Sequence, residues 1–414
     1  MLGIGLYAWK KSTEDSEGYL LGGRNLHPAV AALSAGASDM SGWLLLGLPG
    51  ALYAAGLVEA WIGIGLFVGA VLNWTIVAPR LREQTERLGN ALTIPEFMAN
   101  RFPSRAVALR VVSAIVIVVF FMVYSAAGLV GGGKLFETAF PALLPDTGLS
   151  DYMMGVWITA GVVLAYTMVG GFLAVSLTDF VQGCIMFIAL ILVPVIAYFV
   201  IGGWSGMESA ITSAPSYVDA DSGAVGPARS QFFDMWPESM TVVGLVSLLA
   251  WGLGYFGQPH IIVRFMAIRS LKDIKTARII GMSWMLVTVI GAVFVGAVGV
   301  AYVQQHDLGA QLTDSEAIFI LLSQIIFHPL VAGFLLAAIL AAIMSTISSQ
   351  LLVSSSSITE DVYKTFFRRE ASQSELVMIG RIATVVVSLV AIALAFDPNS
   401  NILDLVSNAW AGFG

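Results

Sequence analysis

Charged residues are scarce in this sequence: Asp, Glu, Lys and Arg make up 11% of the 414 residues, whereas 57% are hydrophobic. The mean hydropathy is +0.85, which a soluble core of this length would not show. Apolar stretches long enough for a membrane helix, which takes about 20 residues, recur along the whole chain. The scarcity of charge therefore excludes a soluble globular protein and predicts a polytopic helical membrane protein.

Cysteine and histidine are also too sparse to build a structural or catalytic centre. Cys184 is the single cysteine, so it cannot form an internal disulfide, and the four histidines show no metal-ligand spacing. A formal net charge of −7 and a pI near 5.1 are poor matches for a nucleic-acid-binding protein. The sequence also lacks the G-x-x-x-x-G-K-[ST] phosphate loop, so nothing indicates nucleotide-driven chemistry.

The hydropathy pattern predicts nine spanning segments and one incomplete segment at the end. Met1 to Trp9 is apolar but too short to span, and the last segment stops at Gly414, so we expect the native protein to extend beyond both ends. The predicted segments are 29–55, 57–78, 106–133, 151–170, 173–202, 240–263, 279–304, 328–358, 376–396, and one beginning at 402.

The orientation follows from the basic residues, which favour cytoplasmic loops. Clusters within 10–24, 80–105, 264–278 and 364–369 all fall on one side of the predicted segments, with Arg264 assigned to the third of these loops. The opposite loops carry mainly aspartates. A missed or invented helix would place basic clusters on both sides, so this alternation supports the segment assignment.

The order of the segments predicts an internal repeat. Five segments precede a long polar outer loop at 203–239 and five follow it, and because five is odd the second set starts from the opposite side of the membrane. This is the condition for an inverted-topology repeat, although no clear residue identity links the halves. We expect one transport domain over 1–414, with an N-terminal remnant at 1–28 and repeats at 29–202 and 240–414.

Two predicted segments are interrupted at corresponding places in the two halves. "SAGASDMSGW" clusters glycine and short polar residues in mid-span, which weaken a helix and compete for its backbone. "LLAWGLGYFGQPHI" carries three glycines and Pro259, which removes a backbone donor. Interrupted helices bind substrate and ions in inverted-repeat transporters. Tight helix packing is the alternative explanation for the glycines.

A third polar element lies in "AAILAAIMSTISSQLL" of the eighth segment. Ala342, Ser345 and Thr346 stand at i, i+3 and i+4, so a backbone carbonyl and two hydroxyls can face one point. Neutral oxygens suit a hard monovalent cation such as sodium. Alternatively, the hydroxyls bond back to the preceding turn or to a neighbouring helix. We assign the later run Ser354 to Ser357 to a wet helix end.

"LGGR", "SAGASDMSGW", "WGLGYFGQPHI" and "AILAAIMSTISSQLL" together resemble the solute:sodium symporter family, most closely its bacterial proline branch. The resemblance covers nearly the whole chain, and Ala250 is a small departure from the branch pattern. It implies the leucine-transporter-like fold: an all-α polytopic membrane protein with a 5+5 inverted repeat and two discontinuous helices. It also implies a symporter, not an enzyme, that couples inward sodium flux to uptake of a zwitterionic amino acid, L-proline, across the bacterial inner membrane.

The resemblance also assigns individual residues. The sodium ligands it implies are backbone carbonyls and hydroxyls of Ala37, Met40, Ala342, Ser345 and Thr346. Proline suits a site of this kind because its carboxylate fits half-helix N-termini and its ring fits aromatic walls. The substrate contacts implied by the resemblance are Ser41, Gly42, Trp43, Tyr124, Trp251, Tyr255 and Pro259.

Two aspartates within predicted spans need an explanation, because a mid-membrane carboxylate costs about 2.5–3.5 kcal/mol. Asp39 could supply negative potential to the adjacent sodium site, pair with the substrate ammonium, or cap the broken helix. Asp179 lies about two turns inside the fifth segment. The family resemblance places it on the inward exit route of the ion, and the alternative is a helix-end carboxylate in contact with water.

Other functions compete with this interpretation. The same fold could carry another small solute, such as a carboxylate, vitamin or sugar, or form a sensor or channel. An intramembrane aspartyl protease would need two facing aspartates, but neither Asp39 nor Asp179 stands in a G-x-G-D context. The partners we expect are sodium, a small solute and the lipid bilayer. The sequence leaves the oligomeric state open, with a monomer as the expectation.

Overall fold

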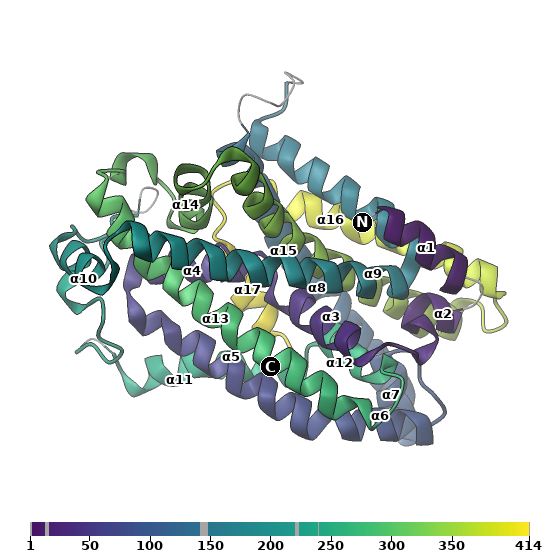
Figure 1. Ribbon diagram of the computed structural model, residues 1–414. Coiled ribbons are helices and arrows are strands. Elements are labelled where there is room, and N and C mark those ends of the chain that lie inside the picture. The colour runs from purple at the N-terminus through teal and green to yellow at the C-terminus, as the bar shows by residue number, and fades with distance from the viewer. Residues whose placement is uncertain (1, 13–15, 141–147, 220–222, 239, 414) are drawn as a thin grey trace.

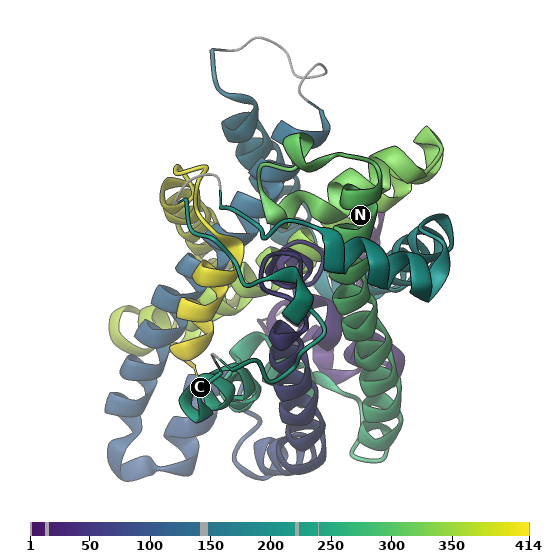
Figure 2. The ribbon, with the colours of Figure 1, turned by 90° about the vertical axis from the view of Figure 1, so that its left-hand side faces the viewer.

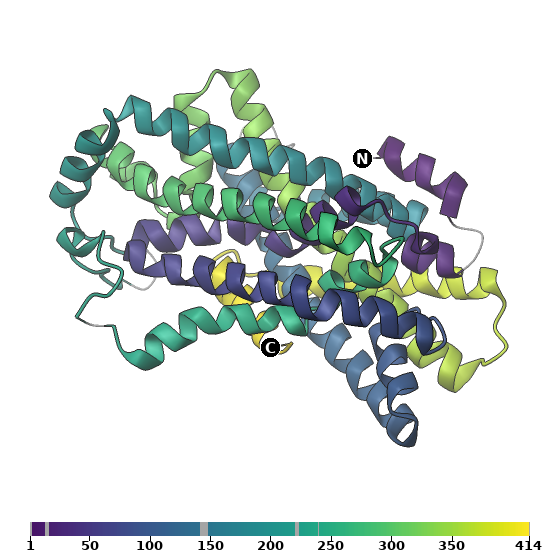
Figure 3. The ribbon, with the colours of Figure 1, turned by 60° about the horizontal axis from the view of Figure 1, so that its bottom comes forward.

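The computed structural model describes residues 2–12, 16–140, 148–219, 223–238 and 240–413. Within these residues the regular secondary structure is helical, with two isolated β-bridges. Figures 1, 2 and 3 show an elongated bundle in which most long helices run lengthwise. Many large apolar side chains, among them Val107, Val112, Ile115 and Val119 of one helix, lie exposed on the outside. An outer surface of this kind is expected where lipid replaces water as the solvent.

The described residues of the first half of the chain form ten α-helices and several short 3-10 or π-helical turns. The α-helices are α1 (Leu2–Ser12), α2 (Ser16–Leu21), α3 (Pro28–Met40), α4 (Gly47–Ala55), α5 (Ala60–Leu72), α6 (Ala78–Arg87), α7 (Ile94–Arg101), α8 (Ala106–Ala139), α9 (Asp151–Val200) and α10 (Gly203–Ser213). Of the short turns, η2 (Gly42–Leu44) joins α3 to α4, and the π-helical η4 (Asn73–Val77) joins α5 to α6.

The second half follows the outer loop and contains the second interruption. Its α-helices are α11 (Val242–Ala250), α12 (Pro259–Ala267), α13 (Asp273–Gln305), α14 (Ile318–Ile326), α15 (Pro329–Ser356), α16 (Gln373–Leu394) and α17 (Ile402–Ala411). The 3-10 turn η7 (Trp251–Phe256) separates α11 from α12, η9 (Ser315–Ala317) precedes α14, and the π-helical η10 (Ser357–Phe367) continues α15.

The described residues contain seven helices long and apolar enough to cross a membrane, and the bent pair Pro28–Met40 and Gly42–Ala55 adds an eighth span. Helix α9 has 50 residues. At 1.5 Å per residue it would measure about 75 Å, more than twice the thickness of a bilayer core. Gly171 divides it, with φ 57° and ψ −152°, a conformation that favours glycine. The predicted segments 151–170 and 173–202 are therefore two crossings that meet at Gly171.

The remaining predicted segments correspond to observed helices with shifted ends. The predicted segment 279–304 is α13, which begins earlier at Asp273. The predicted segment at 402 is the short α17, and Gly414 lies outside the described residues. The sequence analysis missed the apolar helix Ser315–Ile326 and the helix α10. Both lie between spans and carry too short an apolar run to register as crossings.

The interrupted helix α3 lies at the centre of the bundle (Figure 1), where it packs against α9, α12, α13 and α15. Helix α15 is buried along most of its length, including Ser354 to Ser357. The hydroxyls of Ser355 and Ser356 bond back to the carbonyls of Leu352 and Val353 at 2.9 and 2.8 Å. The assignment of this serine run to a wet helix end was therefore wrong, because all four residues are buried. Two of their hydroxyls bond to the backbone of their own helix, while those of Ser354 and Ser357 have no hydrogen-bond partner among the described residues.

The glycines of the second interruption allow close backbone contact. A Cβ at Gly252 would lie 2.2 Å from the Gly65 carbonyl oxygen of α5, and one at Gly69 would lie 2.1 Å from the Gly252 carbonyl oxygen. A Cβ at Gly254 would lie 1.9 Å from Nε1 of Trp410. For these glycines the tight-packing alternative holds, because any side chain would force the interrupted segment away from its neighbours.

We expect Gly69→Ala to destabilise the protein, because the added methyl group forces α5 and η7 apart. Overpacking of this kind costs about 1–3 kcal/mol. Thermal unfolding in detergent, followed by size-exclusion chromatography, measures the effect. Gly161→Ala is the matched control, since a Cβ there has nothing within 4 Å. Equal melting temperatures for the two variants would contradict the packing argument.

Candidate functional site

The first interruption begins where α3 ends. Ser41 has φ 38° and ψ −167°, a strained conformation for a residue other than glycine, and the helix axis turns by 70° at this point. The hydroxyl of Ser41 accepts a hydrogen bond from the Trp43 amide at 3.3 Å, which caps the next turn. Ending α3 here leaves its last four carbonyls without helical donors. Strained residues of this kind cluster at functional sites.

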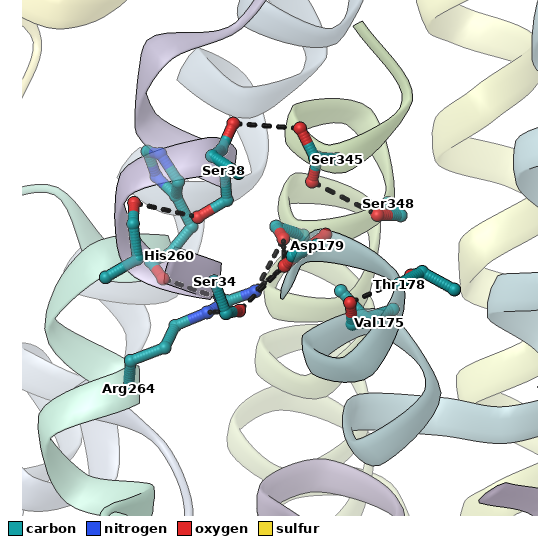
Figure 4. Close-up of polar contacts among 12 residues, drawn as sticks. Ser34, Ser38, Val175, Thr178, Asp179, His260, Arg264, Ser345 and Ser348 are labelled. Atoms are coloured by element: carbon teal, nitrogen blue, oxygen red, sulfur yellow. Dashed lines mark hydrogen bonds and ion pairs between the residues drawn. The ribbon is translucent and has the colours of Figure 1, made fainter. Parts of the chain in front are cut away.

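Side chains of two other helices satisfy two of these carbonyls. Ser345 Oγ of α15 donates to the Ala37 carbonyl oxygen at 2.8 Å, as Figure 4 shows. The Tyr124 hydroxyl of α8 donates to the Asp39 carbonyl oxygen at 3.1 Å. Met40 is fully buried at the end of α3, one turn beyond Ala37. Hydroxyls from outside the helix therefore donate to carbonyl oxygens at the C-terminus of α3, the negative end of its dipole.

The expected oxygen cluster on α15 forms as the sequence spacing requires. The single hydroxyl proton of Ser345 is shared with the Ala342 carbonyl oxygen, which lies 3.0 Å from Oγ, and Thr346 Oγ1 donates to the same oxygen at 3.3 Å. All three residues are buried. Both alternatives raised for these hydroxyls thus apply, because they bond back to the preceding turn and Ser345 also reaches α3. Neutral oxygens gathered against a helix C-terminus suit a hard monovalent cation.

Asp39 links the two interrupted spans. Its Oδ2 accepts a short hydrogen bond from the Tyr255 hydroxyl of η7, while its main-chain carbonyl is held by Tyr124. The other carboxylate oxygen is buried and has no hydrogen-bond partner among the described residues. The sequence analysis did not anticipate a bond between the two broken helices. This contact leaves the three proposed roles of Asp39 open.

At the second interruption, as at the first, side chains of other helices donate hydrogen bonds to main-chain carbonyls. Pro259 begins α12 and has no N–H, so the α-helical hydrogen-bond ladder cannot run through it. Trp410 Nε1 of α17 donates to the Trp251 carbonyl oxygen at 2.6 Å, and Asn73 Nδ2 of η4 donates to the Tyr255 carbonyl oxygen at 2.9 Å. The interrupted backbone is thus satisfied by side chains from both halves of the chain.

Aromatic rings gather where the two interruptions meet. The Trp43 and Trp251 ring centroids lie 6.4 Å apart. The Trp410 ring lies 6.5 Å from Trp251, 5.4 Å from Tyr255 and 6.4 Å from Tyr124. The candidate substrate residues Trp43, Tyr124, Trp251 and Tyr255 are therefore neighbours. Gly42 faces α15, where its absent Cβ would lie 3.0 Å from Ile343 Cγ1.

A buried ion pair lies on the basic-loop side of these interruptions (Figure 4). Arg264 Nη2 of α12 lies 3.2 Å from Asp179 Oδ2 of α9, and both side chains are fully buried. Ser34 of α3 donates to the same oxygen at 2.7 Å, and Ser349 of α15 donates to it at 3.4 Å. Arg264 Nη1 also donates to the His260 carbonyl oxygen at 2.6 Å. Four helices therefore meet at one carboxylate.

This pair corrects two sequence-based assignments. The water-exposed alternative for Asp179 was wrong, because its side chain is fully buried and paired. The assignment of Arg264 to a cytoplasmic loop was also wrong, because it lies inside α12, five residues after Pro259. An arginine directly at the end of the predicted span 240–263, in a chain with an intramembrane aspartate that has no assigned partner, is a usable signal, since such charges normally pair. The sequence analysis missed this signal because it counted Arg264 among the basic residues of a loop.

A cavity of about 860 Å³ opens on the opposite side, toward the loops that carry few basic residues. Lys134 Nζ lies 2.8 Å from Asp314 Oδ2 and 2.8 Å from Glu316 Oε2 on its wall. Glu316 Oε1 accepts from the amides of Ile402 and Leu403 at 3.1 and 3.3 Å, which caps the N-terminus of α17. Carboxylates thus outnumber cations around this entrance, and such a lining attracts cations.

The sodium:solute symporter family model matches residues 19–414. This chain belongs to that family. The osmoregulated proline transporter of Bacillus subtilis is 54% identical to this symporter over 100% of the chain and 79% of the relative. The high-affinity proline transporter of the same organism is 56% identical over 100% of the chain and 82% of the relative. A sodium/proline symporter of Staphylococcus aureus is 51% identical over 99% of the chain and 76% of the relative.

Solved structures support the fold. A Na⁺-coupled sialic acid symporter in a substrate-bound outward-open state matches this symporter with a TM-score of 0.76 at 20% identity, over 95% of this chain and 79% of the other. A nucleobase-cation symporter in a closed conformation gives a TM-score of 0.53 at 12% identity, over 93% and 75%. The fold is therefore the expected leucine-transporter-like arrangement with two discontinuous helices, in a multi-pass membrane transporter.

Three residues of the symporter core were missed as site residues from the sequence. Trp410 lies in the final apolar run, Asn73 is a lone amide within an apolar span, and Arg264 was counted with a loop. A polar side chain in a predicted span signals a buried partner, because lipid satisfies no hydrogen bond. That signal was present for Asn73, but the sequence does not name its partner.

Removing one member of the buried pair should destabilise this symporter strongly. Arg264→Gln leaves the Asp179 carboxylate without its cation, which costs about 3–5 kcal/mol for a buried pair. The double variant Asp179→Asn with Arg264→Gln should recover most of the loss, because neither charge remains. Denaturant unfolding of the purified protein checks both expectations.

Arg87→Gln provides the control, since Arg87 pairs with Glu83 on an exposed surface where such pairs contribute about 0–1 kcal/mol. A double variant as unstable as Arg264→Gln alone would contradict the assignment of the loss to an uncompensated charge.

Proposed function

We propose that this protein is a secondary active symporter that couples inward sodium flux to the uptake of L-proline. The observation that carries the proposal is the buried oxygen cluster between the C-terminus of α3 and α15, where Ser345 joins Ala37 to Ala342. Neutral oxygens in a dry interior are suited to a monovalent cation. The proline-transporting relatives at 51–56% identity support the choice of solute. Their bacterial origin supports the cytoplasmic membrane as its location.

The proposed sodium site uses oxygens from both helices. The Ser345 hydroxyl now donates to the Ala37 carbonyl, so it occupies the position from which a cation would satisfy the same oxygen. When sodium enters, the hydroxyl turns its lone pairs toward the ion and the carbonyls need no other donor. The proposed ligands are the carbonyl oxygens of Ala37, Met40 and Ala342 and the side-chain oxygens of Ser345 and Thr346.

The proposed proline site lies beside the sodium site, between the two interruptions. The carboxylate suits the N-terminal ends of η2 and α12, which are positive ends of helical segments. The pyrrolidine ring suits the aromatic walls. The residues assigned to substrate are Ser41, Gly42, Trp43, Tyr124, Trp251, Tyr255 and Pro259.

Coupling follows from the shared α3. Sodium that joins α3 to α15 fixes the first interruption, which forms one wall of the proline site, so each ligand favours binding of the other. One charge moving through 100 mV releases about 2.3 kcal/mol. At 1.36 kcal/mol per tenfold, that supports about 50-fold accumulation per sodium ion. No nucleotide chemistry is required.

Alternating access follows from the proposed organisation of the chain. We propose that residues 29–202 form the first five-helix repeat and residues 240–414 the second. The outer loop over 203–239 joins the two repeats, and residues 1–28 precede them. Rocking one bundle against the other exposes the binding sites to each side in turn. The cavity that Lys134 and Glu316 line would serve as the outer approach, and the Arg264 and Asp179 pair would close the inner side.

Replacing Ser345 and Thr346 together by alanine should weaken sodium dependence first. The sodium concentration that gives half-maximal proline uptake should rise at least about tenfold, because two of the five proposed ligands are lost. Uptake into proteoliposomes with varied sodium gradients measures this. Ser355→Ala with Ser356→Ala is the control on the same helix, because those hydroxyls only bond back to their own turn. An unchanged sodium response in the first variant would count against the site.

The solute itself is tested by competition. Unlabelled L-proline in excess should abolish sodium-driven uptake of labelled L-proline, whereas a sialic acid should leave it unchanged, because a bulky acidic sugar does not fit between Trp43, Trp251 and Trp410. Uptake that persists without a sodium gradient would identify a passive channel. Sodium-driven uptake of another small solute in place of proline would support the proposed symport mechanism but contradict the assignment of proline as the substrate.

A further inference from the structure

We propose that Asn73 is a positioning residue for sodium-coupled proline binding, because it holds the second interrupted span so that Tyr255 meets Asp39. The inference rests on the proposed function and deepens it. Asn73 Nδ2 donates to the Tyr255 carbonyl oxygen at 2.9 Å, and the Tyr255 hydroxyl donates to Asp39 Oδ2. One residue of the second interruption is therefore fixed at its backbone by η4 and joined at its side chain to the first interruption.

The Tyr255 carbonyl needs a donor from outside its own helix. In a continuous helix this oxygen would accept from the amide four residues later, and that residue is Pro259, which has no N–H. The Gln258 amide does not help, because it donates to the Gly254 carbonyl oxygen at 3.2 Å. A buried carbonyl without a donor is costly where no bulk water reaches it. The amide of Asn73 supplies the missing donor.

The position of Asn73 is set by the face of α5 that carries the interrupted segment. Gly65, Gly69 and Asn73 stand at i, i+4 and i+8, so they follow one side of the helix. The two glycines allow the backbone of Gly252 to touch α5. Asn73 then begins the π-helical turn η4, a local irregularity that is frequent at functional sites. The backbone contact and the amide bond thus act on the same segment, one turn apart.

The link from Asn73 to the proposed ligands is short. Asp39 lies next to Met40 and two residues after Ala37, and its carbonyl is held by Tyr124. If the Tyr255 carbonyl loses its donor, η7 relaxes and the phenol no longer holds the Asp39 carboxylate against the second interruption. The proposed sodium ligands on α3 and the Tyr255 ring of the aromatic wall are then no longer held at a fixed distance from each other. A residue that only filled space would not act through this phenol.

The experiment measures sodium-dependent binding of labelled L-proline to purified protein. Asn73→Leu removes the donor while nearly preserving the side-chain shape, and Asn73→Ala removes it with less bulk. Each should raise the sodium concentration for half-maximal binding and the proline Kd about tenfold, the effect of one lost buried hydrogen bond. Thr75→Val is the control in the same π-helical turn, because its exposed hydroxyl bonds to the Val71 carbonyl oxygen at 2.6 Å and to Arg278 at 3.2 Å and touches neither interruption.

The Tyr255→Phe background distinguishes positioning from packing. Because Phe cannot bond Asp39, Asn73→Leu should change the sodium requirement less than about twofold there, as expected for residues that act in series. An equally large effect in both backgrounds, a wild-type sodium requirement in either Asn73 variant, or failure of both variants to fold would overturn the proposal. The unmodified protein in the same assay tests the proposed function separately, because its sodium-dependent proline binding does not depend on the results for the variants.

Discussion

Four side-chain hydrogen bonds to main-chain carbonyls hold the centre of this protein together. Ser345 and Tyr124 satisfy carbonyls at the end of α3, and Trp410 and Asn73 satisfy carbonyls of the second interruption. Each donor comes from a different helix. Since the membrane interior offers no water to replace these donors, the two interruptions can exist only while α15, α8, α17 and η4 stay in place around them.

The same constraint explains how a symporter can be sensitive to an ion. The α3 carbonyl of Ala37 accepts a hydrogen bond from a hydroxyl of α15. A cation can replace this hydroxyl as the partner of the carbonyl oxygen without any change in the helix itself. Asp39 then matters as a bridge, because its main chain belongs to the first interruption while its carboxylate bonds to Tyr255 of the second. The proposed ion binding at α3 and the proposed solute binding at the aromatic rings would therefore act on one connected network.

The few charges in the bundle interior follow a related pattern. Asp179 and Arg264 are fully buried, yet the pair contacts serines of α3 and α15, the two helices that hold the proposed sodium ligands. A buried ion pair is weak evidence of stability, because desolvation offsets much of its attraction. Its position between α9, α12, α3 and α15 indicates a role in holding these helices in one arrangement on the side of the basic loops.

Much of the fold and part of the candidate site could be predicted. Helix interruption depends on local chemistry, so the glycine and serine cluster before Trp43 and the proline at 259 disclosed both breaks. Helix periodicity placed Ala342, Ser345 and Thr346 on one side of α15. The predicted locations of Arg264 and of Ser354 to Ser357 were wrong. The polarity of a side chain alone does not distinguish a loop or a solvated helix end from a buried position inside the bundle. Polarity also gave no reason to select Trp410, and it marked Asn73 as a buried polar residue without naming its partner.

The sequence by itself determined where the apolar spans lie and the places where two helices must stop, because hydropathy and proline act over a few residues. Only the tertiary structure decided which donor completes which carbonyl. Ser345 and Ala37 are 308 residues apart and Asn73 and Tyr255 are 182 apart. An orphaned carbonyl requires a donor of some kind, but helix packing alone determines which distant side chain comes within hydrogen-bond distance.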